Sequence, residues 1–143
     1  YHINGDSEIR NLTVVHNHFP SFVFGVFEAT QGGAILSAFS VESSIVAFNH
    51  SDIGFYNFGT GAAALEYSLL HDSGVPIDGT IFETSNLQED PLFVSASDAA
   101  SYETNDYRLQ PGSPASDSGS PVYSDPDGST TDMGAYGGPY ATW

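Results

Sequence analysis

Hydrophobic positions in the first half of the chain come in short runs of β-branched and aromatic residues, separated by glycine, asparagine, aspartate and serine. The clearest runs lie at residues 12–15, 22–24, 34–36, 44–48 and 67–70. Runs of this length, bounded by turn-forming residues, are typical of β-strands joined by tight turns. A helical turn is expected only near residues 97–103. The pattern therefore predicts an all-β protein.

Three of these runs repeat one another. Each copy is a short apolar strand that ends in Asn17, Asn49 or Asp72, with an offset of 32 positions between the first two copies and 23 between the second and third. Self-similarity at such periods indicates a solenoid, in which stacked coils bury a common core. We therefore predict that Asn17, Asn49 and Asp72 form one column at a turn, with about one strand spacing of 4.8 Å between neighbours. A second sequence repeat, which we call the second echo, aligns residues 24–27 with residues 53–56.

The last part of the chain has a different composition. Seven of the eight prolines lie at or after Pro76, and glycine is frequent from residue 112 onward. Such a stretch suits an irregular wrapped segment. We expect it to cover the last coil, whose backbone edge would otherwise pair with another chain. We assign the coils to residues 1–87, and the final coil with its capping segment to residues 88–143 of the same domain.

Motifs in this last part resemble the closing segment of bacterial secreted right-handed parallel β-helix proteins of the broad pectate-lyase-like superfamily. They are residues 90–94 (DPLFV), 106–115 (DYRLQPGSPA) and 132–138 (DMGAYGG), and the runs at residues 44–49 and 67–72 resemble the coils. The resemblance implies an all-β, right-handed parallel β-helix with a loop-rich C-terminal cap, secreted or displayed at the bacterial cell surface. It leaves function open, because the superfamily includes lyases, hydrolases, adhesins and non-catalytic surface proteins.

The net charge and the composition exclude several classes of binding partner. The chain has 18 acids, two arginines and no lysine, for a formal net charge of −16. Such a surface repels the phosphate backbone, so we expect no nucleic-acid binding. The absence of cysteine excludes disulfides and thiolate metal sites, and no apolar run is long enough for membrane insertion. The partners that we expect are polysaccharides or neighbouring protein chains.

Catalytic chemistry finds little support in the residues. Lyases that resemble this fold use a lysine or arginine base, often beside calcium. Here lysine is absent, and we expect Arg10 and Arg108 to be structural. The Gly-His-Gly and Arg-Ile-Lys motifs of the hydrolases do not occur either. We therefore assign no catalytic residue in this chain.

Two sets of residues are candidate ligands. Asp125, Asp127, Ser129 and Asp132 place oxygen atoms around a glycine turn, as calcium-binding loops do, and they predict a Ca²⁺ site. The alternative is an ordinary acidic turn whose side chains cap their own backbone. His18, His50 and His71 follow the repeated strands and could bind a ligand or metal, or form stacked ladders of a solenoid surface.

Three functions remain open. The first is a non-catalytic extracellular module with a structural, adhesive or glycan-binding role. The second is the C-terminal part of a polysaccharide lyase or glycoside hydrolase whose active site lies on upstream coils. The third is a calcium-dependent, self-assembling surface subunit.

Overall fold

The computed structural model describes residues 7–16, 27–29, 39–49, 53–57, 63–72, 75–79, 81–97 and 104–141. Within these residues the regular structure is made of β-strands that form three parallel sheets and one antiparallel pair. The first sheet contains β1 (Ser7–Arg10), β4 (Phe39–Glu42), β7 (Ala63–Glu66) and β10 (Ile81–Thr84). The second contains β2 (Thr13–Val15), β5 (Ile45–Ala47) and β8 (Leu69–His71).

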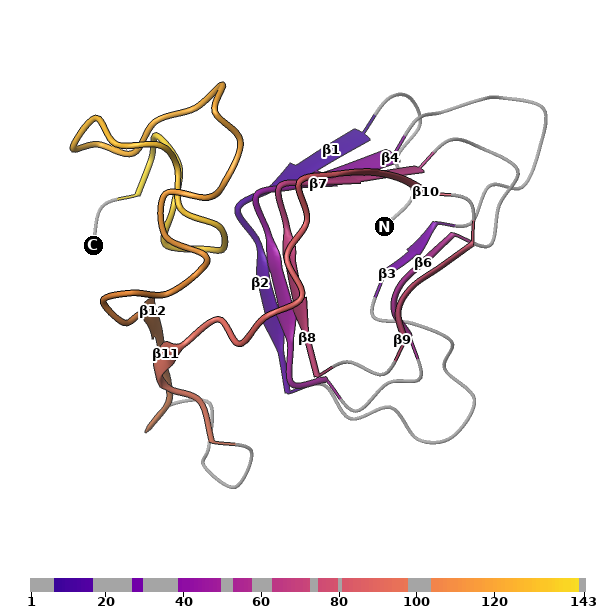
Figure 1. Cartoon of the computed structure of the whole chain (residues 1–143), viewed down its shortest axis with the longest axis horizontal. Coiled ribbons are helices and arrows are strands. Elements are labelled where there is room, and N and C mark those ends of the chain that lie inside the picture. The colour runs from indigo at the N-terminus through magenta and orange to yellow at the C-terminus, as the bar shows by residue number, and fades with distance from the viewer. Residues whose placement is uncertain are drawn as a thin grey trace.

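The third parallel sheet contains β3 (Phe27–Ala29), β6 (Ile53–Asn57) and β9 (Val75–Gly79). Strand order in each sheet follows every third strand of the chain, so each set of three strands makes one coil. Viewed down the stack, the three sheets surround a common interior (Figure 1). The chain is therefore an all-β protein with the parallel β-helix that the sequence predicts.

Alternate residues of a strand face opposite sides of its sheet, and inward-facing residues of the first two sheets form an apolar core. Val41, Ala63, Leu65 and Leu70 form a buried cluster, against which Ile9 and Ile81 pack. Val41 and Leu65 occupy the same position in successive coils, since β4 and β7 pair in register. The core is thus a stack of equivalent side chains, and each coil depends on its neighbours to bury them.

Two corners of each coil use a left-handed backbone. Asn11, Ser43, Tyr67 and Ser85 have φ between 47° and 54° at the corner that follows the first sheet. His16, Phe48 and Asp72 have φ between 45° and 55° at the corner that follows the second sheet. Such values are uncommon outside glycine, so their recurrence at equivalent positions shows that the corner geometry is imposed by the stacking of the coils.

The register corrects one part of the predicted column. Residues 12–17 and 44–49 are offset by 32 positions, as expected, because Thr13 pairs with Ile45. The next offset is 24, because Ile45 pairs with Leu69. Asp72 is therefore equivalent to Phe48, and its predicted place above Asn49 is wrong by one residue. Asn17 lies outside the described residues.

The second echo has the same error. Phe27 pairs with Phe55, an offset of 28, whereas the echo placed Phe27 above Tyr56. Because successive side chains of a strand point to opposite faces, a slip of one residue exchanges the two faces of a strand.

A buried polar ladder runs along the first corner, one residue after the left-handed column. The backbone N–H of Leu12 donates to Ser44 Oγ at 3.2 Å, that of Ser44 to Ser68 Oγ at 3.1 Å, and that of Ser68 to Asn86 Oδ1 at 3.1 Å. Each hydroxyl also donates to a backbone carbonyl of its own coil, Ser44 to Glu42 and Ser68 to Glu66, both at 2.9 Å. The ladder therefore satisfies corner N–H groups that the sheets leave unpaired.

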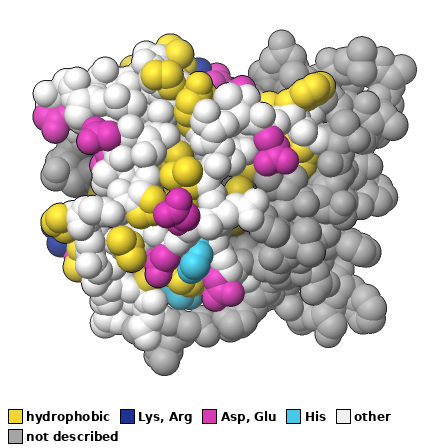
Figure 2. Space-filling view, viewed as in Figure 1, with side chains coloured by type: hydrophobic (Ala, Val, Ile, Leu, Met, Phe, Trp, Pro, Cys, Tyr) yellow, Lys and Arg dark blue, Asp and Glu magenta, His cyan; other side chains and the backbone are white. Residues whose placement is uncertain are grey.

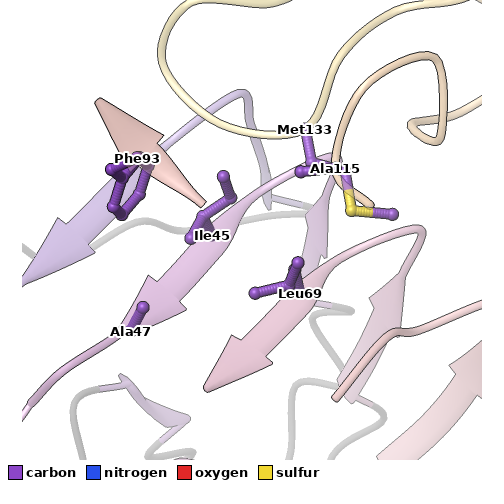
Figure 3. Packing of buried hydrophobic residues seen from close by; sticks show 6 residues of the cluster. All are labelled: Ile45, Ala47, Leu69, Phe93, Ala115 and Met133. Atoms are coloured by element: carbon purple, nitrogen blue, oxygen red, sulfur yellow. The ribbon is translucent and has the colours of Figure 1, made fainter. Parts of the chain in front are cut away.

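The loop-rich closing segment lies along the side of the helix. It includes the antiparallel pair β11 (Phe93–Ser95) and β12 (Asp106–Leu109), and it faces the sheet of β2, β5 and β8 (Figure 1). The outward residues Ile45, Ala47 and Leu69 are buried beneath Phe93, Ala115 and Met133 (Figure 3). The sequence led us to expect this segment over the last coil, but its described contacts are with the side of several coils.

Hydrogen bonds hold the closing segment to the first two coils. Asn11 Nδ2 donates to the Asp132 carbonyl at 3.1 Å, and the Ala135 N–H donates to Thr13 Oγ1 at 2.9 Å. In the second coil, the Gly134 N–H donates to the Ser43 carbonyl at 2.8 Å, and the Ser120 N–H donates to Ser43 Oγ at 2.9 Å. The closing segment is thus attached to the coils by these hydrogen bonds as well as by the apolar cluster that it forms with the outward residues of β5 and β8.

Candidate functional site

The acidic turn predicted to bind calcium is built by Asp125, Asp127 and Gly128. The Gly128 N–H donates to the Asp125 carbonyl at 2.9 Å, and Gly128 has a φ of 90°. An isolated antiparallel bridge joins Ser124 to Thr130 across the turn. The local sequence Asp-Pro-Asp-Gly suits this geometry, because proline favours the second turn position and glycine accepts the positive φ.

The acidic side chains of this turn accept hydrogen bonds from groups of the closing segment itself. Asp125 accepts hydrogen bonds from the N–H of Asp132 at 3.0 Å and of Gly138 at 2.5 Å. Asp127 accepts from the N–H and hydroxyl of Ser129 at 3.0 and 2.6 Å, which lowers its pKa. Asp132 accepts from the Asp117 N–H at 2.7 Å. The carboxylates therefore act as caps of the closing segment.

The predicted calcium ligands lie near one another, and the charges of Asp125 and Asp127 both act on Asp132. Within the described residues, no group of three or more histidines or acids is arranged to hold a metal ion. Burial raises the pKa of Asp132, and the nearby charge of Asp125 raises it further. The structure brings Asp125 and Asp132 together through a backbone contact, and calcium binding at this turn stays a prediction.

We expect the two aspartates of this turn to differ in their contribution to stability. Replacing Asp125 by Ala removes two acceptors of partly buried N–H groups and should cost about 1–3 kcal/mol. Replacing Asp127 by Ala removes only an exposed local contact and should lower the free energy of unfolding much less. Urea unfolding followed by far-UV circular dichroism measures both free energies of unfolding.

The same two variants test the calcium site. If the turn bound calcium, melting temperature would rise in millimolar CaCl₂ beyond a NaCl control of matched ionic strength, and Asp127→Ala would abolish that excess. Equal costs for the two variants would contradict the assignment of Asp125 as the structural member of the pair.

The predicted histidine ligands are only partly described. His18 and His50 lie outside the described residues. His71 ends β8, and its ring meets the edge of the Phe48 ring, with centroids 5.2 Å apart. Phe48 stacks in turn on His16, with centroids 5.6 Å apart and an interplanar angle of 12°. His16 and Phe48 are equivalent residues of successive coils, as the sequence repeat predicts. The same repeat places His71 in their column, which is wrong by one residue, because His71 pairs with Ala47.

This stack extends into the closing segment. Phe93 lies 6.3 Å from the Phe48 ring, and Tyr107 lies 5.4 Å from Phe93 and 6.2 Å from His16, measured between centroids. On the face of the molecule that Figure 2 shows, histidine and acidic side chains lie next to one another in the described part. The rings join the second corner to the β11–β12 pair. The described histidines therefore pack against aromatic side chains and contribute to the attachment of the closing segment.

An acidic cluster around Arg10 escaped the sequence analysis. Arg10 pairs with Glu8 on its own strand, and its Nε lies 3.2 Å from Glu42 Oε2 on the next coil. Its guanidinium also lies 4.4 Å from the centre of the Tyr123 ring in the closing segment. The sequence contained the information needed to predict this pair, because Arg10 and Glu42 are separated by the same 32 positions as the repeated runs at residues 12–17 and 44–49.

Glu42 is the described carboxyl whose environment most resembles that of a catalytic acid. It is only 8% exposed, and burial raises its pKa, while Ser120 and Arg10 act in the opposite direction. Glu8 lies close enough to raise the pKa further. A raised carboxyl pKa beside a second carboxyl is typical of active sites, but ion-pair networks produce it as well.

The second arginine is paired locally. Arg108 Nε lies 2.9 Å from Asp106 Oδ1 on the same strand, and this contact lowers the pKa of Asp106 to about 2. Arg108 thus has a structural partner, as the sequence led us to expect. Both positive charges of the chain are therefore engaged within β1 and β12 and their surroundings.

Comparison of the chain with protein-family models, curated proteins and solved structures finds no match. The described residues contain no helix that is long and apolar enough to span a bilayer. What the geometry defines is thus a class of architecture, a β-solenoid built from parallel sheets.

Proposed function

We propose that this chain is a non-catalytic extracellular β-helix module of the pectate-lyase-like superfamily, with a structural, adhesive or glycan-binding role. The observation that carries the proposal is the use of its charged groups. Arg10 contacts Glu42 of the next coil and the Tyr123 ring of the closing segment. Arg108 pairs with Asp106, and Asp125 accepts hydrogen bonds from the backbone of the closing segment, so each of these charged groups has a structural partner. The repeat architecture supports the same role, because stacked coils present long regular surfaces.

The second candidate is the C-terminal part of a polysaccharide lyase or glycoside hydrolase whose active site lies on upstream coils. Within this chain, the acid to consider for catalysis is Glu42. A buried carboxyl with a raised pKa beside Glu8 could donate a proton to a leaving group. A glycosidase would need a second carboxyl on the opposite side of the bond. Glu8 lies on the same outer face of the first sheet, and Arg10 contacts both acids. This arrangement favours an ion-pair network over a catalytic pair.

Calcium-dependent assembly is a third proposal, supported only by the charge of −16, which a divalent cation would partly relieve. The calcium melts described above test it together with the turn.

Depolymerase assays test the leading proposal. We expect the purified chain to release no unsaturated products or reducing ends from pectate, alginate or neutral glycans above a buffer control. Activity in the native chain that disappears in Glu42→Gln, with an unchanged melting temperature, would contradict it. Glu89→Gln, which alters an exposed acid of the closing segment, is the matched control.

A further inference from the structure

The last coil of the β-helix ends in an open backbone edge within the described residues. β10 is the final strand of its sheet, and Leu87 makes an isolated bridge with Leu69 before the chain turns toward β11. The described closing segment then packs on the outward side of β5 and β8. The end of the stack faces the viewer in Figure 1, and the closing segment lies beside it.

Backbone polar groups alternate along this edge. The Thr84 carbonyl accepts from the Tyr67 N–H at 2.7 Å, so Thr84 points back toward the third coil. Leu87 also points back, because its N–H and carbonyl bond Ser68 and Leu70 at 2.8 and 2.9 Å. Because neighbouring residues of a strand point in opposite directions, Ile81 and Glu83 direct their N–H and carbonyl groups away from the stack. An extended strand is the structure that pairs with such a row.

The polar ladder is also open at this end. In every earlier step, a corner N–H receives a side-chain oxygen from the coil that follows it. Asn86 supplies its oxygen to Ser68 and its amide to the Leu65 carbonyl at 2.8 Å, but its own N–H has no acceptor among the described residues. A strand that continues the stack would satisfy it with a serine, threonine or asparagine at the equivalent position.

The charge at this end selects the partner. Ile9, Val41, Leu65 and Glu83 occupy one inward-facing column, so the apolar core column terminates in a carboxylate. An inward charge at a sheet edge repels neutral or acidic strands. No lysine is present in the chain, and both arginines are paired elsewhere. Acidic side chains are spread over the described part of this face, with arginine only at its margin (Figure 2).

A second copy of the chain fits this edge poorly. If β1 of another copy stacked on β10 in register, Ile9 would lie over Glu83 and Leu12 over Asn86. The first contact buries a carboxylate against an apolar side chain, and the second offers no oxygen to the Asn86 N–H. Two chains that each carry a charge of −16 also repel one another.

We propose that the open edge of β10 binds an extended strand of a cationic partner chain. The strand pairs in parallel with β10 and places a lysine or arginine against Glu83. The partner chain then follows the left-handed corner at Ser85, which places a hydroxyl or amide side chain over Asn86. The requirement for a charge at one position and a hydrogen-bonding group three residues later makes the edge selective. Docking at this edge does not depend on whether the chain also acts on a glycan.

A peptide derived from the chain itself tests the proposal. The probe is a fluorescent peptide of residues 81–87 carrying Glu83→Lys, and binding to the full chain is measured by anisotropy. We expect saturable binding that is weakened about tenfold or more in the protein variants Glu83→Lys and Glu83→Pro. Proline is tolerated there because the Glu83 N–H points away from β7. Glu89→Lys, with the same charge change away from the edge, should retain binding.

Two further peptides sharpen the result. The unmodified peptide of residues 81–87, and the Glu83→Lys peptide that also carries Asn86→Leu, should each bind about tenfold more weakly. Absence of binding, equal binding of all three peptides, or an equal loss in Glu89→Lys would overturn the proposal. Sedimentation of the chain alone is the remaining arm, because self-association that Glu83→Pro abolishes would identify a second copy as the occupant instead. Melting temperatures of the variants establish that they are folded.

Discussion

Replacing Ile45 by Ala should destabilise the chain as strongly as a substitution inside the coils. Ile45 points outward from β5, yet it is only 1% exposed because Phe93, Ala115 and Met133 cover it. Removal of a buried isoleucine side chain costs about 2–5 kcal/mol, depending on how far the cavity collapses. We therefore expect Ile45→Ala and the inward Leu65→Ala to lose similar free energies of unfolding in urea titrations.

An outward residue that nothing covers is the control for this comparison. Phe82 lies on the outer face of β10 and is 65% exposed, so Phe82→Ala should cost less than about 1 kcal/mol. If Ile45→Ala costs no more than Phe82→Ala, the closing segment does not bury the side of the helix in solution.

The sequence predicted the architecture because stacked coils repeat their chemistry. The offset of 32 between residues 12–17 and 44–49 is the true register, and it was recognised from a short strand with an asparagine two residues after its end. The next copy was misplaced by one position because Asp72 was matched to Asn49. In the structure the position equivalent to Asp72 is the left-handed corner residue Phe48. Identity of side chains is a weaker guide than backbone conformation at such a corner.

Several strands left no clear pattern in the sequence. β4 and β7 are four residues long and β10 carries one glutamate at a position where the other coils have Val41 and Leu65. Alternation over so few residues does not separate a strand from a turn. The Arg10–Glu42 pair was missed for the same reason, since both residues belong to strands that were not recognised.

The position of the closing segment could not be read from its composition. Proline and glycine indicate an irregular wrapped segment, but they do not say which surface it covers. The only sign in the sequence that outward-facing residues would be buried was the continuous apolar run at residues 45–48. Such a run is typical of any strand that is buried on both faces, so it does not identify the segment that covers it. The acidic turn illustrates the same limit, because Asp125 and Asp132 were identified together, whereas two of their partners, the N–H groups of Gly138 and Asp117, lie 13 and 15 residues away in the sequence.

The glycines of the closing segment allow a matched test of how tightly it packs. Gly134 and Gly128 have nearly the same φ, 91° and 90°, so an alanine at either position pays a similar penalty for a left-handed backbone. This common penalty is about 1–2 kcal/mol. Their surroundings differ, because a Cβ at Gly134 would lie 2.8 Å from Ile45 Cδ1 and from Thr13 Oγ1, whereas a Cβ at Gly128 would meet nothing within 4 Å.

We expect Gly134→Ala to cost about 1–3 kcal/mol more than Gly128→Ala, because overpacking adds to the backbone penalty. The backbone at Gly134 cannot retreat without lengthening its 2.8 Å hydrogen bond to the Ser43 carbonyl. Free energies of unfolding from urea titration give the difference, and Ile45→Val in the Gly134→Ala background should recover part of it by removing the Cδ1 atom. Equal costs for the two glycine variants, or no recovery in the double variant, would show that the closing segment lies away from β2 and β5.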